Sequence, residues 1–268
     1  MSTALSDIVP VLESIAPLRY AEDWDNVGLL VEPSRDGHAV HRVLLTIDLG
    51  EDVLEEAAER GAELVIAYHP PIFSGLDRLT QANAGERVVV AALRGGIAVY
   101  SPHTALDAAP GGVNDWLADA LGPGERAPLV PASDGAPGVG MGRSALLNDP
   151  LTLDVLVARV KAHLGLSFVR VAAAREHELG KPIRRAAVCA GAGGSLFERL
   201  REPELYLTGE MRHHDVRSKV AAGASVILCD HTNTERGYLP LLARRIAERI
   251  PSVDVTVSSR DRDPLAVV

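Results

Sequence analysis

Short apolar runs alternate along the chain with segments whose apolar positions recur at helical spacing. Residues 5–15 carry apolar side chains at positions 5, 8, 9, 12 and 15, which predicts a helix, whereas residues 64–67 form a solid apolar run of strand length. The same reasoning predicts further strands at 40–47, 97–100, 166–171, 183–190, 205–208, 225–229 and, at a sheet edge, 253–258. It predicts helices at 52–60, 87–93, 115–121, 151–164 and 239–246, one starting at Leu196 and one ending at Ala222. Strands and helices that alternate in this way are typical of an α/β fold with largely parallel sheets.

Residues 122–142 interrupt this alternation. They are rich in glycine, proline and alanine, with prolines at positions 123, 128, 131 and 137. Glycine and proline are the strongest local breakers of regular structure. We therefore predict a crossover between two domains here, with one short strand in it.

The composition is that of an ordinary globular protein, with 47% hydrophobic and 24% charged residues. A net charge of −9 argues against broad electrostatic binding to nucleic acid or to anionic membranes. Apolar runs stay well short of about 18 residues and no charged leader pattern is present, so we expect neither a membrane span nor a signal peptide. Cys189 and Cys229 each end a predicted strand, which favours reduced thiols in a cytoplasmic protein. Any metal would then be held by histidine and carboxylate side chains.

His231 and Glu235 are the first candidates for such a site. They are four residues apart, directly after the predicted strand at 225–229, so in a helical turn both side chains share one face. An imidazole and a carboxylate that meet at such a corner suit a divalent metal ion. The alternative is structural: His231 caps the turn, and Glu235 complements the helix dipole or pairs with Arg236.

Two more strand ends carry residues of the same kind. His69 follows the strand at 64–67, and His103 and Asp107 follow the strand at 97–100, Asp107 in an expected loop. The carboxyl ends of neighbouring strands line the ligand crevice of open α/β sheets, so these side chains converge if the strands are neighbours. Imidazoles and carboxylates in this number could hold two divalent ions, which polarise a bound water and an electrophile together. For each lone histidine the alternative is an ordinary structural role.

A second cluster consists of Glu210, His213 and His214. Consecutive histidines on a helix point about 100° apart, so at most one shares a face with Glu210, and a general acid or base is the better use of this cluster than a metal site. The alternative is an exposed helix start. The glycine-rich run 191–195 could offer N–H groups to a phosphate, although a tight turn is the commoner meaning. Residues 24–28 suit a tight turn that opens into a short apolar strand, and the turn alone is the alternative reading.

Together these segments resemble one family, the GTP cyclohydrolase 1 type 2 homologues, which are hexameric proteins with a dinuclear metal centre. The similarity covers nearly the whole chain in order. It rests on blocks at 24–30, 68–73, 103–115, 208–215 and 231–236.

The resemblance implies two α/β domains with mostly parallel mixed sheets flanked by helices. The metal-binding domain would comprise residues 1–124 and 229–268, and the second, inserted domain residues 125–228. The resemblance also implies a homo-hexamer that holds two divalent ions, with Zn, Fe, Mn, Ni and Mg all open.

By position, His69 and Asp107 resemble ligands of one ion, His231 resembles a ligand of the other, and Glu235 resembles the carboxylate that bridges both. His103 and Glu210 match catalytic or outer positions. Many members have His-His where this chain has Tyr68-His69, and a protonated tyrosine is a poor ligand, so the second ion is expected to bind weakly. The implied activity is a metal-dependent hydrolase acting on a nucleotide-like substrate. The alternative is a non-catalytic metal-binding scaffold, a metallochaperone or a protein-interaction factor.

Overall fold

The computed structural model describes residues 2–34, 37–198 and 200–266, and it divides the chain into two compact units. The first unit comprises Met1–Leu106 and Tyr238–Val268, and the second comprises Asp107–Gly237. Each unit has its own large sheet with helices beside it. The predicted α/β fold class is confirmed. The domain limits expected at 124/125 and 228/229 stay a prediction.

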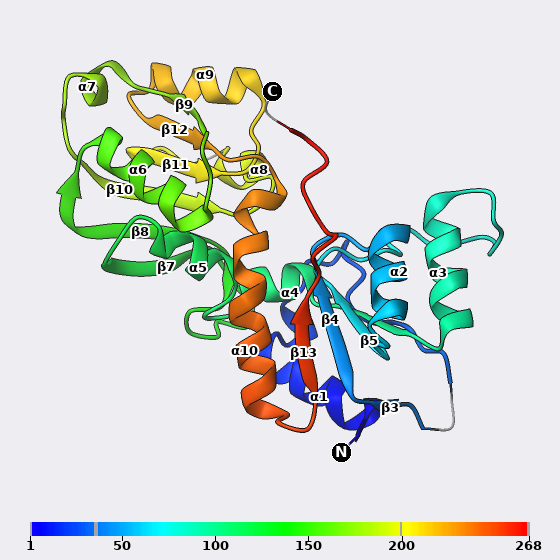
Figure 1. Ribbon diagram of the computed structural model, residues 1–268. Helices are drawn as coiled ribbons and strands as arrows, with labels where there is room; N and C mark the ends of the chain where they lie inside the picture. Colours follow the sequence, from blue (N-terminus) through cyan, green and yellow to red (C-terminus); the bar gives the residue numbers. More distant parts are fainter. Residues whose placement is uncertain (1, 35–36, 199, 267–268) are drawn as a thin grey trace. The chain divides into compact units, whose positions relative to one another are not determined.

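The first unit is built on a five-stranded sheet with the order β13-β4-β5-β6-β2 (Figure 1). Neighbouring strands run parallel, except that β2 pairs antiparallel with β6. The strands are β2 (Gly28–Val31), β4 (Arg42–Thr46), β5 (Leu64–Ala67), β6 (Ala98–Ser101) and β13 (Asp254–Val257). The strands β1 (Thr3–Ala4) and β3 (Ala39–Val40) form a separate two-stranded antiparallel sheet. The strand β13 lies at the sheet edge, as predicted.

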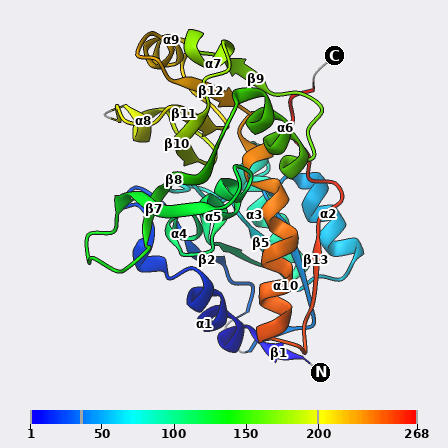
Figure 2. The ribbon, with the colours of Figure 1, turned by 90° about the vertical axis from the view of Figure 1, so that its left-hand side faces the viewer.

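Helices cover both faces of this sheet. They are α1 (Leu5–Ile15), α2 (Glu51–Glu59), α3 (Ala84–Gly95) and α10 (Leu239–Arg249). On one face, apolar residues of α2 and α3 share a core with Val65 and Val99. On the other, α1 and α10 gather around Ile66 and Tyr100, and α10 runs along β4 and β13 in both views (Figure 1 and Figure 2). Burial on both faces explains why β5 is apolar at every position.

Two predicted elements of this unit need correction. The helix α3 begins three residues before the predicted start at residue 87, because the side chain of Asn83 accepts a hydrogen bond from the Glu86 N–H at 2.9 Å and caps the helix. The segment that carries His103 and Asp107 is not a loop but the short helix α4 (His103–Ala108).

The second unit contains a six-stranded sheet with the order β7-β8-β10-β11-β12-β9. The central strands β10, β11 and β12 are parallel, and the outer pairs are antiparallel. The strands are β7 (Gly124–Pro131), β8 (Gly140–Leu151), β9 (Arg170–Ala172), β10 (Ile183–Cys189), β11 (Leu205–Thr208) and β12 (Ser225–Leu228). The helices are α5 (Val113–Asp119), α6 (Leu153–Leu164), α7 (Arg175–Glu178), α8 (Gly194–Phe197) and α9 (His213–Ala221). Among them, α5 packs on β8 and β10, and α9 packs on β12.

The single short strand predicted within residues 122–142 is wrong, because this segment forms β7 and the start of β8. The two strands pair antiparallel along most of their length. A Cβ on Gly124 would lie 2.2 Å from the carbonyl oxygen of Leu146, and one on Gly140 would lie 2.1 Å from that of Val130. These glycines therefore permit close approach of two strands, and the prolines of β7 are tolerated because β7 is an edge strand.

Candidate metal centre

His231 and Glu235 follow β12 and belong to the second unit. Their chain segment is a 3₁₀ turn, Thr232–Thr234, and not the α-helical turn that the sequence predicted. The four-residue spacing still brings the two side chains together, with His231 Nε2 3.4 Å from Glu235 Oε1. Glu235 is buried and His231 is partly exposed. A buried carboxylate beside an accessible imidazole provides one hard and one borderline ligand at the same corner.

A second carboxylate contacts the other nitrogen of His231. Its Nδ1 lies 3.2 Å from Oε2 of Glu210, which follows β11 and is exposed. A histidine whose Nδ1 is held by a carboxylate presents a fixed Nε2, the arrangement that outer partners give to metal-binding histidines. Glu210 also lines an open cleft of about 510 Å³ together with Ser195, Glu198 and Asp215.

Gly191 closes this corner from the end of β10. Its φ of +61° is in the left-handed region, and a Cβ there would lie 2.8 Å from Glu235 Oε1 and 2.9 Å from His231 Nε2. Its N–H donates to Thr234 Oγ1 at 2.8 Å, and its carbonyl accepts from the Glu210 N–H at 2.9 Å. The missing side chain thus leaves a cradle directly over the two candidate ligands.

The glycine-rich run 191–195 leads from β10 into α8, which begins at Gly194. The N–H of Gly193, like that of Gly191, is bonded inside the fold, to Thr208 Oγ1 at 2.9 Å. Two of the N–H groups that a phosphate would need are therefore already in use. His213 and His214 pack ring against ring at 5.4 Å at the start of α9, and neither lines the cleft beside Glu210.

Asp107 is tied to the same corner through its backbone. The buried side chain of Asn114 donates to the Asp107 carbonyl at 3.1 Å and accepts from the Ala190 N–H at 2.9 Å. Burial, together with the negative charges of Asp107 and Glu235, raises the pKa of the Cys189 thiol well above its usual range. Both carboxylates therefore act on one buried thiol, and neither Cys189 nor Cys229 is in a disulfide.

His69 belongs to the first unit and follows β5. Its Nδ1 lies 2.9 Å from Oδ1 of Asp48, and the side chain is 22% exposed. Asp48 thus has the same relation to His69 as Glu210 has to His231, because each holds Nδ1 and orients the imidazole. The preceding residue, Tyr68, is buried, and its ring centroid is 5.1 Å from that of His69.

His103 begins α4 and has a strained backbone, with φ at +25°. Its Nδ1 lies 2.8 Å from Oδ1 of Asp25, whose side chain is fully buried. Burial alone would raise the pKa of Asp25, but hydrogen bonds from His103 and Thr104 and the charge of His103 lower it below its ordinary value. Asp25 comes from the turn that the sequence predicted at residues 24–28. Nothing in its local pattern indicates a partner 78 residues away.

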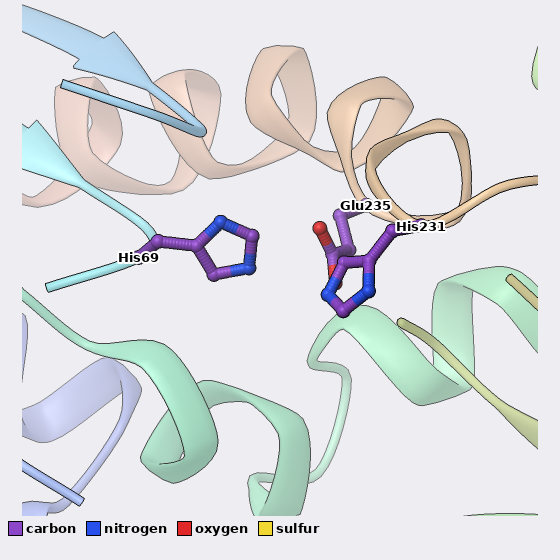
Figure 3. A group of neighbouring side chains, drawn as sticks. All are labelled: His69, His231 and Glu235. Carbon is purple, nitrogen blue, oxygen red and sulfur yellow. The ribbon is translucent and has the colours of Figure 1, made fainter. Parts of the chain in front are cut away.

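Among the described residues, His69 in the first unit and His231 with Glu235 in the second are side chains that could hold a metal ion (Figure 3). His69 follows β5, and the other two follow β12. The condition that the candidate corners follow neighbouring strands is met for β5 and β6 but not for β12, which belongs to the six-stranded sheet. Asp107, His103 and Glu210 are outside this group, and their predicted roles stay predictions.

A family model described as Duf34/NIF3 (NGG1p interacting factor 3) matches residues 3–264 of the chain. The chain belongs to the Duf34/NIF3 family. It is 44% identical to NIF3-like protein 1 of Drosophila melanogaster over 98% of this chain and 89% of that protein. It is 38% identical to NGG1-interacting factor 3 of Saccharomyces cerevisiae over 98% and 96% of the two chains.

Solved structures agree on the fold of this Duf34/NIF3 protein. A Bacillus cereus protein related to NIF3 superposes with a TM-score of 0.88 at 21% identity, covering 100% of this chain and 99% of the other. The family resemblance expected from the sequence is thereby confirmed for NIF3-like proteins. Within the described part of the chain, every helix is too short or too polar to cross a bilayer.

Proposed function

We propose that this Duf34/NIF3 protein is a metal-dependent hydrolase that binds divalent ions through His69, Asp107, His231 and Glu235 and acts on a nucleotide-like substrate. The observation that carries this proposal is the cradle at Gly191, where an imidazole nitrogen and a buried carboxylate oxygen face space that any other residue's Cβ would fill. Imidazole and carboxylate ligands suit Zn, Fe, Mn, Ni or Mg to different degrees, and all five remain candidates.

The residues around the ligands suit the orientation of imidazoles and the transfer of protons. Asp48 and Glu210 each bond the Nδ1 of a candidate ligand, which leaves the Nε2 of His69 and of His231 for a metal. His103, oriented by Asp25, and the exposed Glu210 are the groups we propose to move protons to and from the substrate. Divalent ions in such a site would supply polarisation of an electrophile, which the side chains alone cannot provide.

Glu235 would be a ligand for both ions, and Tyr68, where many family members have a histidine, would leave the second ion bound more weakly. The Tyr68 side chain is buried, and a buried phenol stays protonated at neutral pH. We expect Tyr68→His to raise the metal content from about one ion per subunit towards two. Elemental analysis of the purified variant measures this, and an unchanged ratio would count against an incomplete dinuclear site.

The activity is tested by a nucleotide panel offered to protein purified without oxygen, with each metal added in turn. Glu235→Gln should lose both metal and turnover. Glu210→Gln should keep the metal but lower turnover about 100-fold, the usual contribution of a positioned acid or base. Glu178→Gln, at an exposed position of α7, is the matched control and should behave as wild type. Turnover that survives in metal-free Glu235→Gln would exclude the hydrolase proposal.

A non-catalytic role is the second candidate. It is favoured by one observation, the name of the yeast relative as an interacting factor of NGG1. In that case the metal would stabilise a scaffold for a protein partner or be handed on, and the subunits would form a homo-hexamer in either case. Retained metal without turnover on any nucleotide would favour this candidate, and light scattering would measure the expected mass of six chains.

A further inference from the structure

Two large aromatic side chains of the first unit are exposed beside His103. Trp24 is 59% exposed and Phe73 is 53% exposed, and their ring centroids are 5.9 Å apart at 56°. The whole chain has only two tryptophans, three phenylalanines and five tyrosines. Placing two of them side by side in solvent forgoes the burial that large aromatic rings normally achieve.

Both rings are held in place through their neighbours in sequence. Asp25, next to Trp24, is buried and bonded to His103 and Thr104. Asn26 donates from Nδ2 to the carbonyl of Ile72, the residue before Phe73. The turn and the loop are therefore fastened to each other and to the start of α4, so the two rings form a fixed platform.

His103 stands at the edge of this platform. Its ring centroid is 6.0 Å from that of Trp24 and 6.4 Å from that of Phe73, and the planes are 75° apart in both pairs. The His103 ring also packs near Tyr68 and His69, with ring centroids 5.6 Å and 5.4 Å away. His103, which can exchange protons, thus lies beside the two exposed rings and also beside His69, a candidate metal ligand.

We infer that Trp24 and Phe73 bind a flat heteroaromatic ring of the ligand by stacking, with a purine base as the class of ring. Bases stack readily on tryptophan and phenylalanine, whereas a sugar phosphate offers no π-face. A ring on the platform would present its edge to His103, which could donate or accept a proton there. This inference rests on the proposed function, because it assigns the base-binding part of the same site.

Tryptophan fluorescence tests the platform in a background with Trp116→Phe, which leaves Trp24 as the only tryptophan. The probes are adenosine and guanosine monophosphate, with ribose 5-phosphate as the probe that lacks the base, and the protein is first freed of metal with a chelator. We expect saturable quenching by both nucleotides and none by ribose 5-phosphate. Phe73→Leu should weaken the apparent affinity about tenfold. The control Phe168→Leu, an exposed phenylalanine of the second unit, should leave it unchanged.

Absence of quenching, or equal quenching by ribose 5-phosphate, would overturn the inference. So would a change in the mass of the assembly in Phe73→Leu or Trp24→Leu, since that would mean that a protein surface covers the rings. Elemental analysis of the same preparations before chelation tests the metal proposal separately. Stacking without metal would refute only the metal proposal, and metal without stacking would refute only the platform.

Discussion

The buried carboxylate of Asp25 is bonded to the first two residues of α4, His103 and Thr104. The carboxylate is fully buried and accepts hydrogen bonds from the His103 ring and from the Thr104 N–H at 3.1 Å. Such a carboxylate fixes which imidazole nitrogen carries the proton. If His103 moves protons in the reaction, the orientation that Asp25 provides is part of the machinery.

Asp25→Asn should therefore lower turnover while the metal content stays at the wild-type value. We expect a loss of about 100-fold or more in kcat, because the wrong tautomer of His103 becomes available. The free energy of unfolding should fall by about 1–3 kcal/mol, since the amide N–H of the new asparagine then faces a donor of Thr104 or His103. Urea unfolding and steady-state kinetics measure the two effects. Asp23→Asn, an exposed neighbour, is the control, and equal losses in both variants would remove the special role of Asp25.

Gly191 gives a residue-scale test of the second unit. An alanine there would place its Cβ within 3 Å of both His231 and Glu235, so Gly191→Ala should weaken metal binding about 10–100-fold. Gly165→Ala is a matched control, because Gly165 has a φ of +68° and nothing within 4 Å of its Cβ. An alanine in the left-handed region should lower the unfolding free energy of both variants by about 1–2 kcal/mol. Only Gly191→Ala should bind metal more weakly in a titration. Equal affinities in the two would argue against the cradle.

Spacing was enough to predict the pairing of His231 with Glu235, because four residues in any tight helical turn bring side chains together. It could not predict Asp25 as the partner of His103 or Gly191 as the cover over His231. Those contacts join residues 78 and 40 positions apart, and tertiary packing alone decides them.

At the scale of elements, most strands and helices followed from hydrophobic periodicity. The helix Leu5–Ile15 and the strand Leu205–Thr208 have the predicted limits. Periodicity failed in β7 and β8, where glycines and prolines suggested a loop. Glycine indicates either a turn or two backbones in close contact, and a single sequence does not distinguish these cases.

Residues 258–260, which follow β13, are bonded to α2 by one buried carboxylate. Glu56 accepts hydrogen bonds from the Ser259 N–H at 3.0 Å, from the Arg260 N–H at 3.2 Å and from the Ser258 hydroxyl. Burial by itself would raise the pKa of Glu56, but these hydrogen bonds outweigh it and lower the pKa from 4.5 to about 2. The contact thus ties residues from opposite ends of the first unit's sequence.

Because the folded-state pKa of Glu56 is depressed, its stabilisation is complete above about pH 4.5 and is lost as the pH falls towards 2. Glu56→Gln should cost about 2–3 kcal/mol of unfolding free energy at pH 7 and progressively less in acid. Urea unfolding at a series of pH values measures the difference. Glu55→Gln, whose exposed carboxylate pairs with Arg260, should cost less than about 1 kcal/mol. A cost for Glu56→Gln that does not depend on pH would contradict this account.

At the scale of the whole molecule, the sequence predicted the fold class but not the assignment of strands to sheets. The strands β5 and β6 are parallel neighbours in the five-stranded sheet, whereas β12 pairs with β11 and β9 in the other. Strands and helices alternate along the sequence in the same way whether the strands join one sheet or two. Only the pairing partners, which depend on the folded chain, separate the two arrangements.

The central proposal is that His69, Asp107, His231 and Glu235 are ligands for divalent ions. The most direct test is the metal content per subunit after dialysis against limited chelator, measured by elemental analysis for wild type, His69→Ala, Glu235→Gln and the control His41→Ala, whose side chain is 53% exposed. We predict that wild type and His41→Ala retain at least about one ion per subunit and that His69→Ala and Glu235→Gln each lose it. Full retention of metal in either His69→Ala or Glu235→Gln would contradict the claim.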